Sequence, residues 1–268
     1  MNVSVIISNY NYAEYVGSAI GSCLKQTVEP KIIIVDDCSS DGSWEIITRY
    51  TTDHKNVTGV RLKVNSGGNA RGKNVGICLA DTEFVTCLDS DDMLLPNSIE
   101  TRLNVFSDDI DFVQGWSITV YGQESYNEFI KNGVLNRPFK QNRKAKNLAT
   151  EKNTPRWSFA IQASTVLSKR CLYDRMGLYD EEMKWSIDRE MWWRWLSHSA
   201  KLKIIDEYVS LYRCHKGQVT GDRNRKNPKK QQALLKHRQE MRKQLAKENT
   251  MFPESYDFMS YVDKVISL

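Results

Sequence analysis

The sequence lacks any C-x-x-C pair, any long apolar run and any N-terminal leader pattern. Its six cysteines are scattered, several of them in apolar segments, which predicts reduced core thiols rather than disulfide bonds or a zinc site. No apolar run approaches the roughly 20 residues needed to span a bilayer. Met1 leads straight into an apolar segment typical of a strand, not into a signal peptide. We therefore expect a cytoplasmic protein without a transmembrane segment.

Two familiar nucleotide-binding motifs are also missing. The glycine-rich stretch at 67–76 is not a G-x-G-x-x-G sequence directly after the first strand, so a dinucleotide site is poorly supported. The stretch lacks G-x-x-x-x-G-K-[ST] as well, which leaves a P-loop unsupported. Two interpretations remain: a flexible loop, or a loop that offers the cations of Arg71 and Lys73 to an anionic ligand.

The composition is that of a soluble globular protein. Apolar residues make up 40% and charged residues 26% of the 268 positions, and the net charge of +5 is modest. This length suits one large domain, or one domain with an appendage.

Short apolar runs alternate with segments of helical spacing in the first hundred residues. Because such alternation is typical of βαβ units, we expect an α/β fold with a doubly wound, mostly parallel, Rossmann-like sheet. The expected strands are Val3–Ile7, Lys31–Val35, Val57–Val64 and Phe84–Leu88.

Carboxylates follow two of these strands at the point where each strand ends. Asp36 and Asp37 follow the second strand, and Asp89, Asp91 and Asp92 follow the fourth. Right-handed crossovers bring the carboxyl ends of parallel strands to one edge, where ligands bind in open α/β sheets. Clustered carboxylates repel one another unless a cation joins them, which favours a divalent metal carrying phosphates. The competing interpretation is an acidic turn or a helix N-cap.

The second half carries further strand-like runs and two candidate polar residues. Asp188 stands at the start of an expected helix rich in tryptophan, and His215 closes a strand-like run at 203–213. A simpler interpretation of Asp188 is a carboxylate that complements the helix dipole, and the tryptophans would then be core residues. The simpler interpretation of His215 is a structural histidine. Between these halves, residues 121–155 are polar and basic, which indicates an insertion rich in loops.

The segment 221–268 is crowded with Lys and Arg and carries a thin apolar stripe, which predicts a basic amphipathic helix. Three interpretations are open for this extension: packing on the body of the protein, contact with nucleic-acid phosphates, or contact with an anionic membrane surface.

The order of these motifs, over roughly residues 3–215, resembles GT-A-type glycosyltransferases of family 2, which use nucleotide-diphospho-sugars. Residues 35–42 are similar to the family's V-D-D-x-S-x-D-G, and 65–76 to its N-x-G-x-x-x-A-R-N-x-G. Residues 88–92 correspond to L-D-x-D-D, and 212–215 to Y-R-x-H. Ile187-Asp188 stands where the family usually has Glu-Asp. The sequence departs from the pattern at Ser8, where a proline is common, and at Asn74, which follows Gly72-Lys73.

The resemblance implies a GT-A domain at 1–220, with a nucleotide-sugar-binding half at 1–92 and an acceptor and catalytic half at 110–220. It implies Asp188 as the catalytic base, with Trp157 and Trp185 against the acceptor. The implied nucleotide-sugar contacts are Ser8, Asn9, Tyr10, Asp37, Arg71, Asp89 and Ser90. The implied ligands of Mn²⁺ or Mg²⁺ are Asp91, Asp89 and His215.

Sugar transfer needs a neutralised diphosphate leaving group and a base that takes the acceptor proton. One carboxylate opposite the metal suffices for a single displacement that inverts the anomeric centre, and no clear second carboxylate is available as a nucleophile. We expect a UDP-sugar donor. A glycan, a lipid-linked saccharide or a modified base in DNA is the expected acceptor.

Two other classes of protein compete with this interpretation. The basic insertion and extension also suit a nucleic-acid-binding protein without transferase activity, although charge alone is weak evidence. A sugar-nucleotide pyrophosphorylase shares the fold type, but it needs a glycine- and arginine-rich signature after the first strand. Residues 8–11 are Ser-Asn-Tyr-Asn instead.

Overall fold

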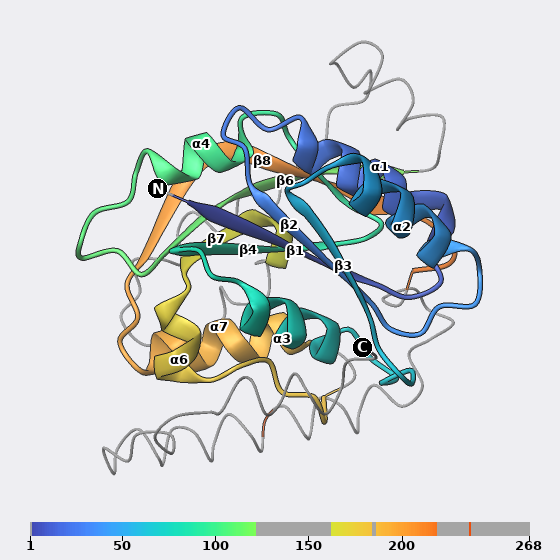
Figure 1. The fold of residues 1–268 in the computed structure, drawn as a ribbon. Coiled ribbons are helices and arrows are strands. Elements are labelled where there is room, and N and C mark those ends of the chain that lie inside the picture. The colour runs from blue at the N-terminus through green and yellow to red at the C-terminus, as the bar shows by residue number, and fades with distance from the viewer. Residues whose placement is uncertain (1, 122–161, 184–185, 219–235, 237–268) are drawn as a thin grey trace.

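The computed structural model describes residues 2–121, 162–183, 186–218 and 236. Within these residues, eight strands form one sheet in the order β3-β2-β1-β4-β7-β6-β8-β5 (Figure 1). The strands are β1 (Val3–Asn9), β2 (Lys31–Asp36), β3 (Val57–Arg61), β4 (Phe84–Asp89), β5 (Met93–Leu94), β6 (Phe112–Tyr121), β7 (Val166–Lys169) and β8 (Leu202–Cys214). The helices are α1 (Ala13–Leu24), α2 (Ser43–Asp53), α3 (Ala70–Leu79), α4 (Ser98–Leu103), α6 (Cys171–Met176) and α7 (Ile187–Ser197), with a 3₁₀ turn, η3, at Ala163–Thr165.

The sheet is parallel where the site residues gather. Strands β3, β2, β1 and β4 pair in parallel, and Ser8 of β1 lies opposite both Val35 of β2 and Asp89 of β4. Strand β7 then joins antiparallel to β4 and β6, whereas β6 and β8 are parallel. This architecture confirms the predicted α/β fold with a mostly parallel sheet.

Helices cover both faces of the sheet (Figure 1). On one face, Val5 and Ile7 of β1 belong to a buried apolar cluster that includes residues of α1, α2 and α4. On the other face, Ile6 belongs to a cluster that includes residues of α3, α6 and α7, Trp192 among them. Because successive strand residues point to opposite faces, burial on both faces explains why β1 is continuously apolar. Each fully buried Ile or Val contributes about 1.5–3 kcal/mol to folding.

A glycine allows α3 to lie directly on β1. A methyl group built at Gly76 would overlap the Cγ2 atom of Ile6, so any larger residue here would push the helix away from the strand. At the start of the same helix, a methyl group at Gly72 would come within 3.1 Å of the Ser8 Cβ. These close approaches hold α3 directly against β1, with its first turn beside Ser8 of β1 and the Val35 carbonyl of β2.

Several element boundaries differ from those expected from the sequence. The first strand runs on to Asn9 rather than ending at Ile7, and the third strand ends at Arg61 rather than Val64. The predicted basic insertion at 121–155 lies outside the described residues except for Tyr121, and the extension at 221–268 lies outside them except for Lys236.

All six cysteines are free thiols; Cys23, Cys78 and Cys87 lie in the core as the sequence predicts, whereas Cys38 and Cys214 are half-buried and Cys171 is exposed. Among the residues that the structure describes, no helix combines the length and the apolar character needed to cross a membrane.

Candidate active site

Asn9 and Asp36 form a buried polar network at the carboxyl ends of β1 and β2. The Asn9 amide donates to Asp36 Oδ1 at 2.8 Å and to Ser39 Oγ at 3.2 Å. The backbone N–H of Ser39 donates to the other Asp36 oxygen at 3.0 Å, and Arg61 lies 3.5 Å from that oxygen. These hydrogen bonds satisfy the buried Asp36 carboxylate and hold the loop after β2 in place.

Asp37 connects the loop after β2 to the glycine-rich loop before α3. Its carboxylate accepts hydrogen bonds from the Ser66 backbone N–H at 2.9 Å, the Ser66 hydroxyl at 2.8 Å and the Asn65 amide at 3.1 Å. Burial raises the pKa of the Asp37 carboxyl, and the hydrogen bonds from Ser66 oppose that rise. The neighbouring Cys38 adopts a left-handed conformation with φ of 62°, which turns the chain sharply after Asp37.

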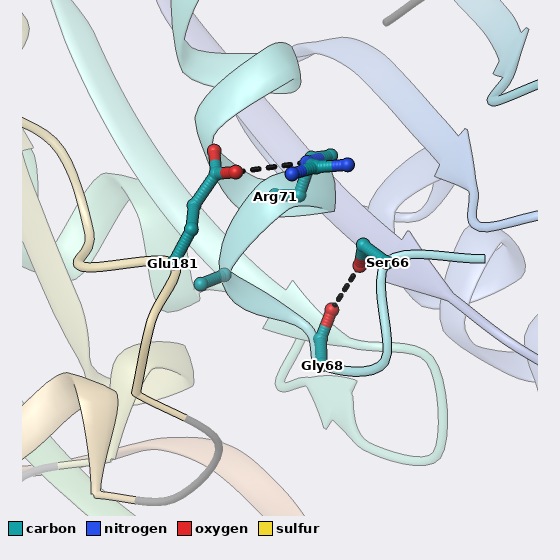
Figure 2. A pocket seen from close by; sticks show the side chains of 5 residues that line it. Ser66, Gly68, Arg71 and Glu181 are labelled. Atoms are coloured by element: carbon teal, nitrogen blue, oxygen red, sulfur yellow. Dashed lines mark hydrogen bonds and ion pairs between the residues drawn. The ribbon is translucent and has the colours of Figure 1, made fainter. Parts of the chain in front are cut away.

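A small hollow of about 60 Å³ opens beside this loop, and its wall includes Arg71 at the start of α3. Figure 2 shows the Arg71 guanidinium meeting the carboxylate of Glu181, with 2.8 Å between Nε and Oε2. In the same view the Ser66 hydroxyl donates to the Gly68 carbonyl at 2.7 Å. The hollow therefore lies between the glycine-rich loop before α3 and the segment that leads into α7.

Lys73 joins Asp89 at the end of β4 to Asp188 in the first turn of α7. Its Nζ lies 3.1 Å from Asp89 Oδ1 and 3.2 Å from Asp188 Oδ1, and its own side chain is fully buried. Burial disfavours the ammonium ion, but the carboxylates of Asp188 and Asp89 outweigh it and raise the pKa of Lys73 above its usual value. Lys73 is therefore a charged, doubly paired residue at the centre of the site.

Asp188 is held by its helix yet remains accessible. The preceding Ser186 adopts a left-handed conformation with φ of 59°, so α7 begins abruptly and Asp188 falls in its first turn. Its side chain keeps 26% of its surface exposed. Burial raises the pKa of the Asp188 carboxyl, and the Lys73 ammonium opposes that rise. A partly exposed carboxylate with this environment is suited to accept a proton.

Asp91 lies beside His215, at the place where β5 pairs with β8. The Nε2 atom of His215 lies 3.1 Å from Asp91 Oδ2, and the rings of Tyr12 and Tyr15 contact the imidazole at centroid distances of 5.6 and 4.6 Å. The two residues are 124 positions apart in the sequence. The fold therefore gathers an oxygen and a nitrogen ligand type at one point of the acidic edge.

A complete metal cage is not present in the described part of the chain, where no three His, Cys, Asp or Glu side chains gather closely enough to hold an ion. The pair of Asp91 and His215 still fits a metal that arrives with a diphosphate. Mg²⁺ in nucleotide sites is commonly bound by one or two carboxylates together with substrate phosphates and water.

Three further residues lie along the same edge. Ser8 and Ser90 bury hydroxyl oxygens that have no hydrogen-bond partner among the described residues, whereas Tyr10 is 46% exposed. Buried hydroxyls without partners suit contacts with a ligand. The Asp92 carboxylate is buried, and its Oδ1 accepts the backbone N–H of Arg213 at 3.0 Å. This hydrogen bond joins Asp92 to strand β8.

The two tryptophans predicted to contact the acceptor cannot be compared with the structure. Trp157 and Trp185 both lie outside the described residues, so their place against the acceptor stays a prediction. Of the residues predicted for the acceptor and catalytic side, the structure therefore describes Asp188.

The structure joins Asp89 to Asp188 through Lys73 and places Asp91 beside His215. Sequence reasoning did not assign Lys73 to this site, although a signal was present. In the family pattern the arginine stands directly before Asn-x-Gly, and here Lys73 stands directly before Asn74-Val75-Gly76. Aligning the motif from this end, rather than from Ala70-Arg71, identifies Lys73.

A sheet of this topology, with its polar edge at the carboxyl ends of β1, β2 and β4, defines a GT-A fold. The chain belongs to glycosyl transferase family 2, whose sequence profile matches residues 4–169.

Individual relatives of the chain also carry the name of glycosyltransferases. The glycosyltransferase GlyG of Streptococcus pneumoniae is 40% identical over 100 residues, which cover 37% of this chain and 33% of GlyG. An uncharacterised glycosyltransferase of Rickettsia typhi is 28% identical over 222 residues, which cover 81% of this chain and 65% of the relative. The chain therefore spans between about one third and two thirds of the length of these relatives.

Solved structures share the fold. Staphylococcus aureus TarS in complex with UDP-GlcNAc matches with a TM-score of 0.62 and 23% identity, over 81% of this chain and 60% of that chain. The mannosyltransferase PcManGT of Pyrobaculum calidifontis, in complex with GDP-Man and Mn²⁺, matches with a TM-score of 0.60 and 14% identity. That match covers 98% of this chain and 79% of PcManGT. At these identities the likeness establishes the fold.

Proposed function

We propose that the protein is a metal-dependent, inverting glycosyltransferase that moves a sugar from a nucleotide-diphospho-sugar to an acceptor hydroxyl, with Asp188 as general base. The observation that carries this proposal is the placement of Asp188 beside the donor-side edge. Its carboxylate and that of Asp89 flank the same Lys73 ammonium, at 3.2 and 3.1 Å. A base and a donor carboxylate held this close can act on one bound substrate pair.

The donor is held along the edge formed by β1, β2 and β4. The backbone of residues 8–10 forms the floor for the nucleotide, with Asp37 and Arg71 contacting the base, ribose or phosphates. The unsatisfied hydroxyls of Ser8 and Ser90 support this assignment, because a buried hydroxyl without a partner is costly until a ligand supplies one.

Asp91 and His215, with Asp89 beside them, would hold Mn²⁺ or Mg²⁺. When bound, the metal supplies positive charge to the diphosphate as it leaves. Asp89 is less free for this task than Asp91, because one of its oxygens is paired with Lys73. We therefore assign Asp91 as the main protein ligand and Asp89 as a donor-side partner.

Asp188 takes the proton of the acceptor hydroxyl as that oxygen attacks the anomeric carbon. The proton moves to a carboxylate oxygen, and the bond between the sugar and the diphosphate breaks in the same displacement. Inversion of the anomeric centre follows from a single displacement. A retaining reaction would need a second carboxylate as nucleophile.

The comparisons favour a UDP-sugar donor without fixing the acceptor. TarS binds UDP-GlcNAc, and TarS and a related Bacillus enzyme carry the names of poly(ribitol-phosphate) sugar transferases. PcManGT binds GDP-Man together with Mn²⁺. We propose UDP-sugar as the donor class, and a glycan, a lipid-linked saccharide or a modified base in DNA as the acceptor, with Trp157 and Trp185 against it. The basic extension would bring the enzyme to an anionic surface.

A donor screen with matched aspartate variants tests the proposal. UDP-, GDP- and dTDP-sugars are incubated with the wild type and Mn²⁺ or Mg²⁺, and nucleotide release is measured. Asp188→Asn should lower release about 10²–10⁴-fold, since a general base contributes that much, while nucleotide affinity stays close to wild type. Asp91→Ala should instead weaken metal-dependent nucleotide binding.

Asp81→Asn is the matched control, because Asp81 pairs with Lys31 at the opposite end of the sheet and should leave release unchanged. Full turnover by Asp188→Asn would contradict the assignment of the base. Absence of release from every donor would contradict the transferase function itself.

A further inference from the structure

Lys73 is a buried cation between the donor side and the base. Its Nζ contacts Asp89 at 3.1 Å and Asp188 at 3.2 Å. These residues come from α3, from the end of β4 and from the first turn of α7. One ammonium group therefore joins side chains that are up to 115 positions apart.

Packing alone does not explain a charged residue at this position. Taking an ammonium ion out of water is costly, and an apolar side chain of similar length would fill the same space without that cost. The Lys73 Nζ also lies 5.4 Å from the centre of the Tyr179 ring, where the ring face favours a cation. The environment is thus arranged around the charge itself.

We propose that Lys73 is a positioning residue that fixes the Asp188 carboxylate relative to Asp89, so that the base and the donor lie at a constant separation. This inference rests on the proposed function. Lysine suits the task because its ammonium nitrogen presents three donors around one compact point, and it can reach two carboxylates at once. The planar fork of arginine matches a single carboxylate better.

The exposed face of Asp188 shows why such an anchor matters. Asp188 Oδ1 bonds Lys73, while 26% of the side chain remains accessible to an acceptor. Without Lys73, the carboxylate keeps the backbone hydrogen bond from Ala163 but loses the contact that fixes it relative to Asp89. A misplacement of about 1 Å in an active site costs on the order of 100-fold in rate.

The test measures UDP release from UDP-GlcNAc with Mn²⁺, or from whichever nucleotide sugar the wild type cleaves faster. Lys73→Met removes the charge at nearly constant length, and we expect kcat to fall about 100-fold while KM for the donor changes less than about threefold. Lys73→Arg keeps the charge and should recover part of the lost kcat. Lys31→Met is the matched control, since Lys31 pairs with Asp81 away from the site and its kcat should stay at the wild-type level.

A second measurement separates positioning from a general structural role. In an Asp188→Asn background, Lys73→Met should cause no further loss of kcat, because a residue that acts through Asp188 then has nothing to position. Melting temperature and UDP affinity report whether each variant folds. If Lys73→Met does not fold, Lys73→Gln replaces it, since its neutral, shorter amide cannot bridge the two carboxylates and a loss of kcat is still expected.

Unchanged kcat in a folded Lys73→Met or Lys73→Gln variant would overturn the inference, and so would losses that multiply in the double variant. A wild type that cleaves no nucleotide sugar at all would overturn the proposed function, and this inference with it. An active wild type with an unaffected Lys73→Met variant would leave the proposed function standing and remove only the positioning role.

Discussion

If Asp188 is the general base, the ionisation of its carboxyl group determines how activity depends on pH. Burial raises the pKa of this group, with partial opposition from Lys73. Because a general base works only when ionised, activity is present above the raised pKa and is lost as the pH falls through it. We expect kcat for nucleotide release to decline at a pH higher than the usual pKa of aspartate, about 3.9.

The measurement is a kcat profile against pH, with circular dichroism at each point to show that the protein stays folded. A folded enzyme whose kcat is constant down to the ordinary aspartate pKa would count against Asp188 as the base.

The sequence was informative about residues whose role depends on local context. An apolar run that ends in Asp36-Asp37 or in Asp89 predicts a strand end, and the structure ends β2 at Asp36 and β4 at Asp89. For Lys73 the family motif was the available signal, because its partner Asp188 in α7 follows more than 100 residues later. A glycine-rich loop with two cations gives no local sign of which cation is buried.

At the scale of the elements, we expect a glycine-to-alanine substitution to have opposite effects on stability in two helices, α3 and α1. Gly76→Ala places a methyl group onto Ile6 and should destabilise the protein by about 1–3 kcal/mol through overpacking. Gly21→Ala meets nothing closer than 4.0 Å in α1 and should stabilise the protein by about 0.5–1 kcal/mol, since alanine favours the helix.

Urea denaturation of the two variants and the wild type gives these free energies. The paired design removes helix propensity as an explanation, because both substitutions gain it. Equal stability of the two variants would show that α3 does not need its close contact with β1.

At the scale of the whole molecule, donor binding should stabilise the entire described fold. The proposed donor and metal contacts come from β1, from the loops after β2 and β4, from the start of α3 and from His215 just after β8. A ligand at 100 times its dissociation constant stabilises the native state by about 2.7 kcal/mol. For a chain of this size that corresponds to a rise of about 5–10 °C in melting temperature.

The measurement is thermal unfolding with UDP and Mn²⁺, with UDP and a chelator, and with AMP and Mn²⁺ as the control. We expect the full rise only with UDP and the metal. An equal rise with the chelator would contradict a metal-dependent nucleotide site.

Sheet order in the second half was beyond what the sequence could predict. A β-prone run reveals a strand but not its neighbour, and β7 pairs with β4 across more than 80 positions. The parallel pairing of β6 with β8 also contains register shifts near Trp116, which no periodicity in the sequence indicates. The first half was predictable because its strands alternate with helices, and right-handed crossovers then bring β1 beside β4 in a parallel sheet although 81 positions separate paired residues such as Val3 and Phe84.

The contact between Asp91 and His215 has a consequence for biosynthesis. The ribosome delivers Asp91 first and His215 only 124 positions later. At about 5–20 residues per second, that interval is roughly 6–25 s. During this time the strands of the first half can already pair, but the partner that completes the acidic edge has not yet been translated. If Asp91 and His215 hold the metal as proposed, a nascent chain gains this pair only when the residues after β8 have left the ribosome.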